Sequence, residues 1–185
     1  MLIQLGAKYV PQKVSKKAKD FTPSLNLVLF EEPEAFLHPD RAGMFFAQSV
    51  LLVEGPSETA LINRLLDDGK LSLPQGAYIL DCLGKYNIHR FMNLLSALGV
   101  IHAVLHDDDD NKDEHQELNQ LISDSKHADF TRYVVTLPKD LETVLGVTPP
   151  GSSRKKPQHL LYCYSCGQIH DGKLADFCSK VPACF

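Results

Sequence analysis

Short apolar runs alternate with amphipathic stretches along most of this chain. The runs are strand-sized, as buried strands of a parallel sheet are. They cover Leu25–Phe30, Val50–Val53, Ala77–Leu80, Ile101–Leu105 and Tyr133–Leu137. The stretches between them repeat their apolar residues three or four positions apart, as the buried face of a helix does. Strands that alternate with helices at these lengths predict an α/β fold with a parallel, doubly wound, Rossmann-like sheet.

Helices are expected between the runs. The pair Gly55–Pro56 ends one strand, and Gly55 or Ser57 can cap the helix that follows. The expected helices extend from this cap to about Asp68, from about Ile88 to Leu98, near His115–Ser123 and near Asp140–Leu145. The segment 148–157 is expected to be a loop, and a last element begins at Gln158–Tyr164.

Acidic residues follow three of the predicted strands at the points where the strands end. Glu54 follows one strand, the run Asp107–Asp110 follows another, and Asp140 with Glu142 follows a third. Ligands of doubly wound sheets bind beyond the carboxyl ends of the strands, so these acids are expected at the ligand-binding edge. Glu58 lies in the first helical turn after Glu54, where it either faces the same pocket or only complements the helix dipole.

The four consecutive carboxylates after His106 favour a metal site, although a solvated acidic turn is the alternative. These carboxylates repel one another unless a cation compensates their charge. Asp107 and Asp109 are two residues apart, and in an extended segment both would point to the same side. Hard oxygen ligands of this kind suit Mg²⁺ or Mn²⁺ rather than Zn²⁺.

Composition is that of a globular protein with a core. Of 185 residues, 44% are hydrophobic and 23% are charged, which excludes a disordered tail, a coiled coil and a collagen-like chain. No stretch reaches the roughly 18 apolar residues of a membrane helix, and residues 1–20 lack the order of a signal peptide. A cytoplasmic location without membrane contact is therefore expected. The net charge of −4 does not indicate a general attraction to nucleic acid.

The five cysteines are expected to be thiols in a reducing compartment. Cys163-x-x-Cys166, with His170 downstream, admits a zinc interpretation. The second pair, Cys178 and Cys184, is separated by five residues rather than two, so zinc binding is not expected.

The segment LLVEGPSE, followed later by a strand and DDDDN, resembles the Toprim domain of topoisomerases, bacterial primases and certain nucleases. The paired glutamates of EGPSE, the Asp-Leu-Glu at 140–142 and the Lys-Pro at 156–157 are similar to those of the OLD (overcoming lysogenization defect) family of nucleases. The resemblance spans roughly Phe46–Leu161. It implies a Toprim sheet flanked by helices, two Mg²⁺ or Mn²⁺ ions, hydrolysis of DNA by an endonuclease, and a role in antiphage defence or DNA repair.

The resemblance also implies roles for single residues. Six carboxylates would hold the ions, the first three one ion and the last three the second: Glu54, Asp107, Asp109, Glu58, Asp140 and Glu142. The catalytic residues would be Glu54, Glu58, Asp107, Asp109 and Lys156. Lys156 would stabilise the charge that develops on the cleaved phosphate. Lys85, Arg90 and Lys155 are candidate contacts for the DNA backbone.

Upstream, LVLFEEPEAFLHP resembles the Walker B region of ABC-type ATPases, which OLD proteins carry before the Toprim domain. The match places Glu31 where a magnesium-binding Asp is usual, Glu32 where the water-activating glutamate lies, and His38 in the signature that follows. The sequence has no GxxxxGK[ST] phosphate loop, so ATP hydrolysis by this chain alone is not expected. The expected domains are a truncated ATPase remnant (1–45), the Toprim domain (46–150) and a basic, Cys-containing extension that completes the site (151–185).

Other functions and partners stay open at this point. A catalytically inactive or partner-dependent interaction module derived from an OLD-like nuclease is the main alternative to the endonuclease. Another Toprim chemistry is less favoured, because topoisomerases need a nucleophilic tyrosine on a separate domain and primases use a zinc-binding partner region. DNA is the expected partner, and a homodimer and a missing ATPase half or helicase-like partner are left open.

Overall fold

The computed structural model describes residues 39–109 and 113–184. The chain divides into two compact units, Met1–Ala42 and Gly43–Phe185. In the first unit the described element is the short helix α2 (Pro39–Ala42). The second unit contains the sheet and the helices around it, and it is the unit in which the described acids at the strand ends lie.

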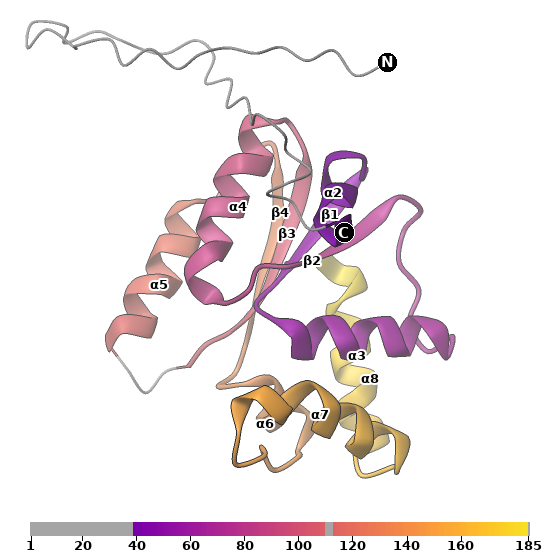
Figure 1. Ribbon diagram of the computed structural model, residues 1–185. Helices are drawn as coiled ribbons and strands as arrows, with labels where there is room; N and C mark the ends of the chain where they lie inside the picture. Colours follow the sequence, from indigo (N-terminus) through magenta and orange to yellow (C-terminus); the bar gives the residue numbers. More distant parts are fainter. Residues whose placement is uncertain (1–38, 110–112, 185) are drawn as a thin grey trace, which may run out of the picture. The chain divides into compact units, whose positions relative to one another are not determined.

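Four parallel strands form the sheet of the second unit (Figure 1). They are β1 (Ser49–Val53), β2 (Ala77–Asp81), β3 (Ile101–Asp107) and β4 (Thr131–Leu137). Their order in the sheet is β2-β1-β3-β4. The chain runs from β1 to β2 on one side of β1, and then crosses to β3 on the other side of β1. The strand order therefore reverses between β1 and β3, and a crevice at the carboxyl ends of these two strands is the usual ligand site of such a sheet.

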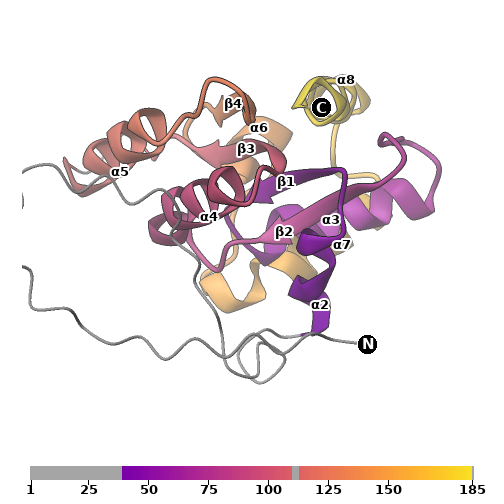
Figure 2. The same cartoon turned by 90° about the horizontal axis from the view of Figure 1, so that it is seen from above.

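Helices cover both faces of this sheet (Figure 2). On one face lie α4 (Lys85–Ala97) and α5 (Asp113–Asp124). On the other lie α3 (Pro56–Asp67), α6 (Leu141–Leu145), α7 (Lys156–Ser165) and α8 (Asp171–Lys180). Three short 3₁₀ turns, η1 (Gly43–Phe45), η2 (Ser153–Lys155) and η3 (Pro182–Cys184), complete the described elements. The result is a three-layer α/β/α arrangement, which confirms the predicted fold class.

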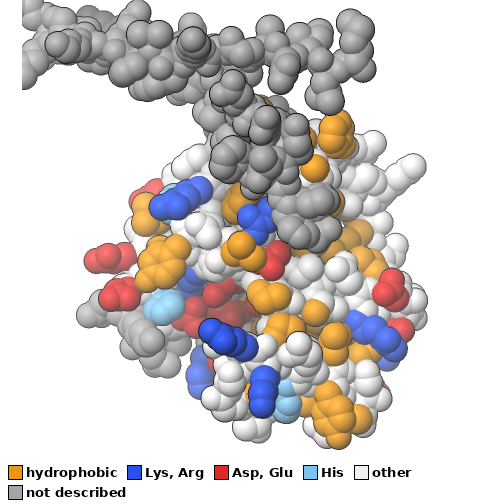
Figure 3. All heavy atoms as spheres, in the orientation of Figure 1, with side chains coloured by type: hydrophobic (Ala, Val, Ile, Leu, Met, Phe, Trp, Pro, Cys, Tyr) orange, Lys and Arg blue, Asp and Glu red, His pale blue; other side chains and the backbone are white. Residues whose placement is uncertain are grey.

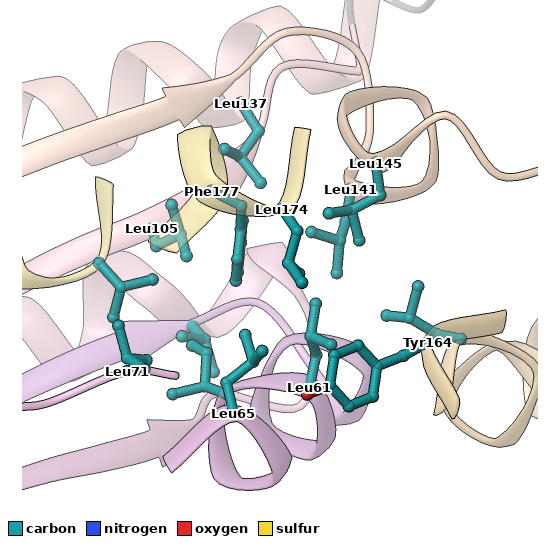
Figure 4. Close-up of a cluster of buried hydrophobic side chains, with 14 of the residues drawn as sticks. Leu61, Leu65, Leu71, Leu105, Leu137, Leu141, Leu145, Tyr164, Leu174 and Phe177 are labelled. Atoms are coloured by element: carbon teal, nitrogen blue, oxygen red, sulfur yellow. The ribbon is translucent and has the colours of Figure 1, made fainter. Parts of the chain in front are cut away.

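The larger part of the core lies between the sheet and helices α3, α6, α7 and α8 (Figure 4). Leu105 of β3 and Leu137 of β4 are fully buried there, together with Leu61 of α3 and Phe177 of α8. Complete burial of a side chain of this size contributes about 1.5–3 kcal/mol. The C-terminal helices are therefore an integral part of the second unit, and they close one side of the sheet.

The predicted strands and helices of the second unit are confirmed, with differences at their ends. β3 extends two residues beyond the predicted strand, to Asp107, and α4 begins at Lys85 rather than near Ile88. Gly84 precedes α4 with a φ of 110°, a conformation that a residue with a Cβ rarely adopts. In the segment 148–157, which was expected to be a loop, η2 is present and α7 begins. Helix α8 was not predicted.

Several expectations fall outside the described part of the chain. The strand Leu25–Phe30 and the Walker B residues Glu31, Glu32 and His38 lie there, as does Asp110 of the acidic run. Among the described residues, no helix is long and apolar enough to cross a membrane.

Candidate metal centre

The acids of the candidate site come from the carboxyl ends of three neighbouring strands, β1, β3 and β4. Glu54 directly follows β1, Asp107 is the last residue of β3, and Asp140 with Glu142 begins α6 after β4. In Figure 3 acidic side chains gather near the middle of the visible face, with Lys and Arg side chains on both sides of them. The structure therefore brings together acids that are far apart in the sequence, at the place where the strand order reverses.

The turn between β1 and α3 positions the two glutamates of the EGPSE segment. Gly55 caps α3, and its backbone N–H donates to Oε2 of Glu58 at 3.1 Å, as in a capping box. Glu58 is consequently buried, with 5% of its surface exposed. Burial and the nearby charge of Glu54 raise the pKa of Glu58 to about 7. Burial and the charge of Asp109 also raise the pKa of Glu54.

Asp107 is the most perturbed acid of the site. The Asp107 backbone N–H donates to Oε2 of Glu54 at 3.4 Å, so the end of β3 lies against the end of β1. Its Oδ1 atom is buried without a hydrogen-bond partner among the described residues. Burial, followed by the charges of Glu58 and Glu54, raises the pKa of Asp107 to about 9. An uncompensated carboxylate is therefore unfavourable at this position.

The loop after β3 is not the extended segment that the sequence predicts. Asp109 has a φ of 52°, in the left-handed region, so the alternation of an extended strand does not apply beyond Asp107. The backbone N–H of Asp108 donates to the carbonyl of Leu137 at 2.9 Å, and that of Asp109 to the carbonyl of Lys139 at 3.0 Å. Two bonds to the end of β4 thus set the path of this loop. The charge of Asp109 nevertheless raises the pKa of both Glu54 and Asp107.

Lys85 does not lie on the surface, as a contact for a DNA backbone would. Its side chain is 2% exposed, and its ammonium donates to the carbonyls of Asp107 and Asp108 and to Oδ2 of Asp109. The interpretation of Lys85 as a DNA contact is therefore wrong for this structure, because no phosphate reaches a side chain that is enclosed by its own acidic loop. The other two candidate contacts, Arg90 on α4 and Lys155 on η2, are exposed.

On the opposite side of the site, Lys156 pairs with Glu142. Its ammonium lies 3.2 Å from each carboxylate oxygen of Glu142, and the Glu142 side chain is 3% exposed. Burial alone would lower the pKa of Lys156, but the charges of Glu142 and Asp107 outweigh it, and the net shift is upward. Lys156 therefore stays charged while it faces the acids.

Asp140 acts as the N-cap of α6. Its Oδ1 accepts from the backbone N–H of Thr143 at 2.7 Å. Burial tends to raise the pKa of Asp140, but the bonds from Thr143 and the charges of Lys156 and Lys139 lower it below its ordinary value. Asp140 is thus an ionised acid at the edge of the site, with one oxygen engaged by the helix.

Two residues of α5 that the sequence did not single out lie against the acidic loop. Asn119 donates to the carbonyl and to Oδ1 of Asp108, both at 2.9 Å. His115 Nδ1 lies 3.3 Å from Oδ2 of Asp109. These two residues are four positions apart, on one face of the helix that follows the acidic run. That spacing was available in the sequence as a signal.

The donor set is compatible with a divalent cation. Every acid at the site offers hard oxygen ligands, and the buried Oδ1 of Asp107 lacks a partner among the described residues. Burial, and then the charges of the neighbouring acids, raise the pKa of Glu54, Glu58 and Asp107. As the side chains stand, residues 39–109 and 113–184 contain no group of three His, Cys, Asp or Glu arranged to hold an ion. The carboxylates of Glu58, Asp109 and Glu142 are engaged by Gly55, Lys85 and Lys156, respectively.

Part of this chain matches a known protein family. Residues 45–109 match the family described as "Overcoming lysogenization defect protein-like, TOPRIM domain". Solved structures of the C-terminal region of the OLD protein from Xanthomonas campestris pv. campestris are similar to this chain. The iodine-phased structure has 18% identity and a TM-score of 0.41, over 74% of this chain and 80% of that one. The mercury-phased structure has 17% identity and a TM-score of 0.39, with the same coverage. A search of curated protein sequences gave no match.

Proposed function

We propose that this chain, whose residues 45–109 match the OLD-like Toprim family, is a metal-dependent endonuclease that hydrolyses phosphodiester bonds in DNA. The observation that carries the proposal is Asp107. It is a carboxyl at the end of an interior strand, and its burial, together with the charges of two nearby glutamates, raises its pKa to about 9. Such a carboxyl is costly as an anion unless it is compensated, and a divalent cation is the compensation that hard oxygen ligands favour.

The ion ligands in this proposal are six carboxylates, three for each of two ions: Glu54, Asp107 and Asp109 for one, and Glu58, Asp140 and Glu142 for the other. Mg²⁺ or Mn²⁺, when bound, supplies activation of the attacking water and stabilisation of the leaving oxygen. The protein contributes the closely spaced carboxylates and the order of the strand ends that hold them. Asp140 can keep its bond to Thr143 in this role, because that bond uses one of its two oxygens.

Lys156 is the proposed residue for the developing negative charge of the substrate. Its side chain is 34% exposed and its ammonium is held by Glu142. A scissile phosphate at the acidic edge would offer this ammonium a second anionic partner, which stabilises charge as it forms. Arg90 and Lys155, both exposed, are the remaining candidates for contacts with the DNA backbone.

The proposal is tested by incubating supercoiled plasmid with the protein and Mg²⁺ or Mn²⁺. Asp107→Asn keeps the size of the side chain and removes its charge, and we expect it to lower the nicking rate by about 100-fold or more. Asp67→Asn, at the exposed end of α3, is the matched control and should nick as the parent protein does. Equal nicking by the two variants, or no nicking by the parent protein, contradicts the proposal.

A non-catalytic interaction module is the second candidate, and one observation favours it. Lysines already compensate two of the acids, Asp109 and Glu142, without any ion. Calorimetric titration with Mn²⁺ separates the two candidates: a nuclease of this kind should take up two ions per chain, whereas a module of this kind needs none. The result of the titration does not depend on finding the right DNA substrate.

The expected domain division belongs to the same proposal. Lys156, from the segment 151–185, completes a site whose acids up to Glu142 lie in the segment 46–150. A location in the cytoplasm, a role in antiphage defence, a homodimer and an ATPase or helicase-like partner remain predictions.

A further inference from the structure

We infer that Lys85 is a built-in cation that positions the acidic loop Asp107–Asp109, so that this side of the site is assembled before any divalent ion binds. The importance of this loop for metal binding rests on the function proposed above. The contacts of Lys85 with the loop do not, and they can be tested without DNA.

The Lys85 ammonium has three donors, and the loop offers one oxygen to each. The distances from Nζ are 2.6 Å to the carbonyl of Asp107, 3.1 Å to the carbonyl of Asp108 and 3.3 Å to Oδ2 of Asp109. Two of the three partners are backbone carbonyls. A simple ion pair would compensate only the Asp109 charge, whereas these contacts fix the path of the backbone through the loop.

The contacts from the two sides of the loop complement one another. The backbone N–H groups of Asp108 and Asp109 point to the end of β4, where they donate to Leu137 and Lys139. The carbonyls of Asp107 and Asp108 point the other way, to Lys85. Asp109 keeps a left-handed backbone in this arrangement, with a φ of 52°, which is uncommon for a residue other than glycine. The loop is therefore held from both sides in a conformation that it would not favour alone.

The start of α4 is itself fixed relative to the site. The backbone N–H of Gly84 donates to the carbonyl of Glu54 at 2.7 Å, and the side chain of Asn87 donates to the carbonyls of Cys82 and Leu83. Lys85, the first residue of α4, thus has a defined position beside the end of β1. A cation at a helix N-terminus is opposed by the helix dipole. Its burial there is explained by the three oxygens that it meets, and not by the helix.

The consequence is a site in which one positive charge is already present. The Lys85 charge lowers the pKa of Glu54, against the effects of burial and of Asp109. Without this lysine the carbonyl of Asp107 would keep its contact with His106 Nδ1 and that of Asp108 its bond from Asn119, but the loop would lose the one cation that joins three of its oxygens. Lys85 is therefore a positioning residue, because it acts on the proposed ion ligands Asp107 and Asp109 through the backbone of their loop.

The test is site-resolved amide hydrogen exchange of the full chain in EDTA. In the parent protein the bonded amides of Asp108 and Asp109 should be protected. In Lys85→Ala their exchange should accelerate by about 10-fold or more, while the amides of the interior strand β1 stay protected. Lys126→Ala, an exposed lysine after α5, is the control and should leave both regions unchanged. Unchanged protection at Asp108 and Asp109 in Lys85→Ala overturns the inference.

Chemical rescue distinguishes positioning from a general loss of packing. Propylammonium can occupy the space left in Lys85→Ala and supply three N–H donors, and it should restore the protection of the loop. Tetramethylammonium carries the same charge without a donor and should not. Restoration by both cations to the same degree, or by neither, overturns the inference. Lys85→Met keeps the apolar stem of the side chain, and it replaces Lys85→Ala in the hydrogen-exchange measurement if the alanine variant does not fold. A Lys85→Met chain that stays unfolded with Mn²⁺ also overturns it, because Lys85 would then serve the whole fold.

The Mn²⁺ affinity of the variants connects the role of Lys85 to the proposed metal site. It also distinguishes a failure of the proposed nuclease function from a failure of the proposed role of Lys85. We expect Lys85→Ala to bind Mn²⁺ about 10-fold more weakly than the parent protein, and propylammonium to recover most of this loss. A parent protein that shows Lys85-dependent loop protection but never nicks DNA contradicts the proposed function alone. A nicking parent protein whose Lys85→Ala variant has normal loop protection and normal Mn²⁺ affinity contradicts the role of Lys85 alone.

Discussion

Two lysine–carboxylate pairs flank the acidic edge of the sheet. In one pair the lysine is the buried partner, and in the other pair the carboxylate is. In the pair from α4, the Lys85 side chain is 2% exposed and Asp109 is 30% exposed. In the pair from α7, Lys156 is 34% exposed and Glu142 is 3% exposed. A buried ammonium cannot leave its partners without losing compensation, whereas a half-exposed one can turn on its flexible stem. The buried Lys85 therefore suits a fixed structural role, whereas the more exposed Lys156 suits a change of partner.

The contacts of the two lysines agree with this difference. Lys85 is bound by two backbone carbonyls in addition to a carboxylate, so its position is tied to the path of the chain. Lys156 contacts the side chain of Glu142, and the charges of Glu142 and Asp107 raise its pKa. It therefore remains a cation near an edge where, in the proposed reaction, a phosphate would arrive. The acidic edge thus has a permanent charge on one side and a movable one on the other.

The largest effect that would separate the two lysines is on activity. Lys156→Gln keeps an N–H donor for Glu142 but removes the charge, and we expect nicking to fall by about 100-fold. The free energy of unfolding should fall by about 1–3 kcal/mol, because the Glu142 carboxylate, 3% exposed, keeps a hydrogen bond but loses its cation. Plasmid nicking and urea denaturation measure the two quantities, with Lys126→Gln as the control. A loss of stability with normal nicking would show that Lys156 is the structural lysine instead.

The next effect concerns the buried acids Asp107 and Glu58 and the pH dependence of the free energy of unfolding. The folded pKa values of Asp107 and Glu58 are raised to about 9 and about 7. The folded chain therefore holds protons that the unfolded chain has already lost, and in EDTA its stability should fall as the pH rises from about 4 to about 9. Between pH 5.5 and 8.5 we expect a loss of roughly 2–4 kcal/mol.

Asp107→Asn sharpens this test, because the amide cannot ionise. In EDTA at pH 8.5 the variant should be more stable than the parent protein, and most of the pH dependence should be gone. Saturating Mg²⁺ should stabilise the parent protein at high pH and have little effect on the variant. Denaturation curves at several pH values provide the measurement. A parent protein whose stability rises with pH in EDTA would show that these carboxyls are ionised without a metal.

The sequence was sufficient to predict the sheet, because the buried strands are nearly continuous apolar runs. Val50–Val53 within β1 and Ile101–Leu105 within β3 are examples. The acids at strand ends were equally predictable, since a parallel sheet brings all carboxyl ends to one edge. The missed helix α8 is short and mostly polar, and Leu174 and Phe177 are its two buried apolar residues. Leu174, Phe177 and the following Val181 are three and four positions apart, as on one face of a helix, so a short signal was present in the sequence.

The surroundings of the charged residues could not be predicted. A lysine at the start of an amphipathic helix is typical of a solvated charge, and only the packing of α4 against the end of β3 buries Lys85. The left-handed conformation of Asp109 depends likewise on the carbonyl of Lys139, thirty positions along the chain. Such features follow from tertiary contacts rather than from local preference.

The smallest expected effect comes from removing residues 1–42. Both lysine pairs, the described ligand candidates and the buried core belong to the unit Gly43–Phe185. We therefore expect the shortened chain to fold, to bind Mn²⁺ as the full chain does, and to unfold within about 2 °C of it, a shift below about 1 kcal/mol for a domain of this size. Circular dichroism and calorimetric titration test this expectation. A chain that folds but has lost Mn²⁺ binding would place part of the site in the first unit. An unfolded chain would show that the first unit stabilises the sheet that carries both pairs.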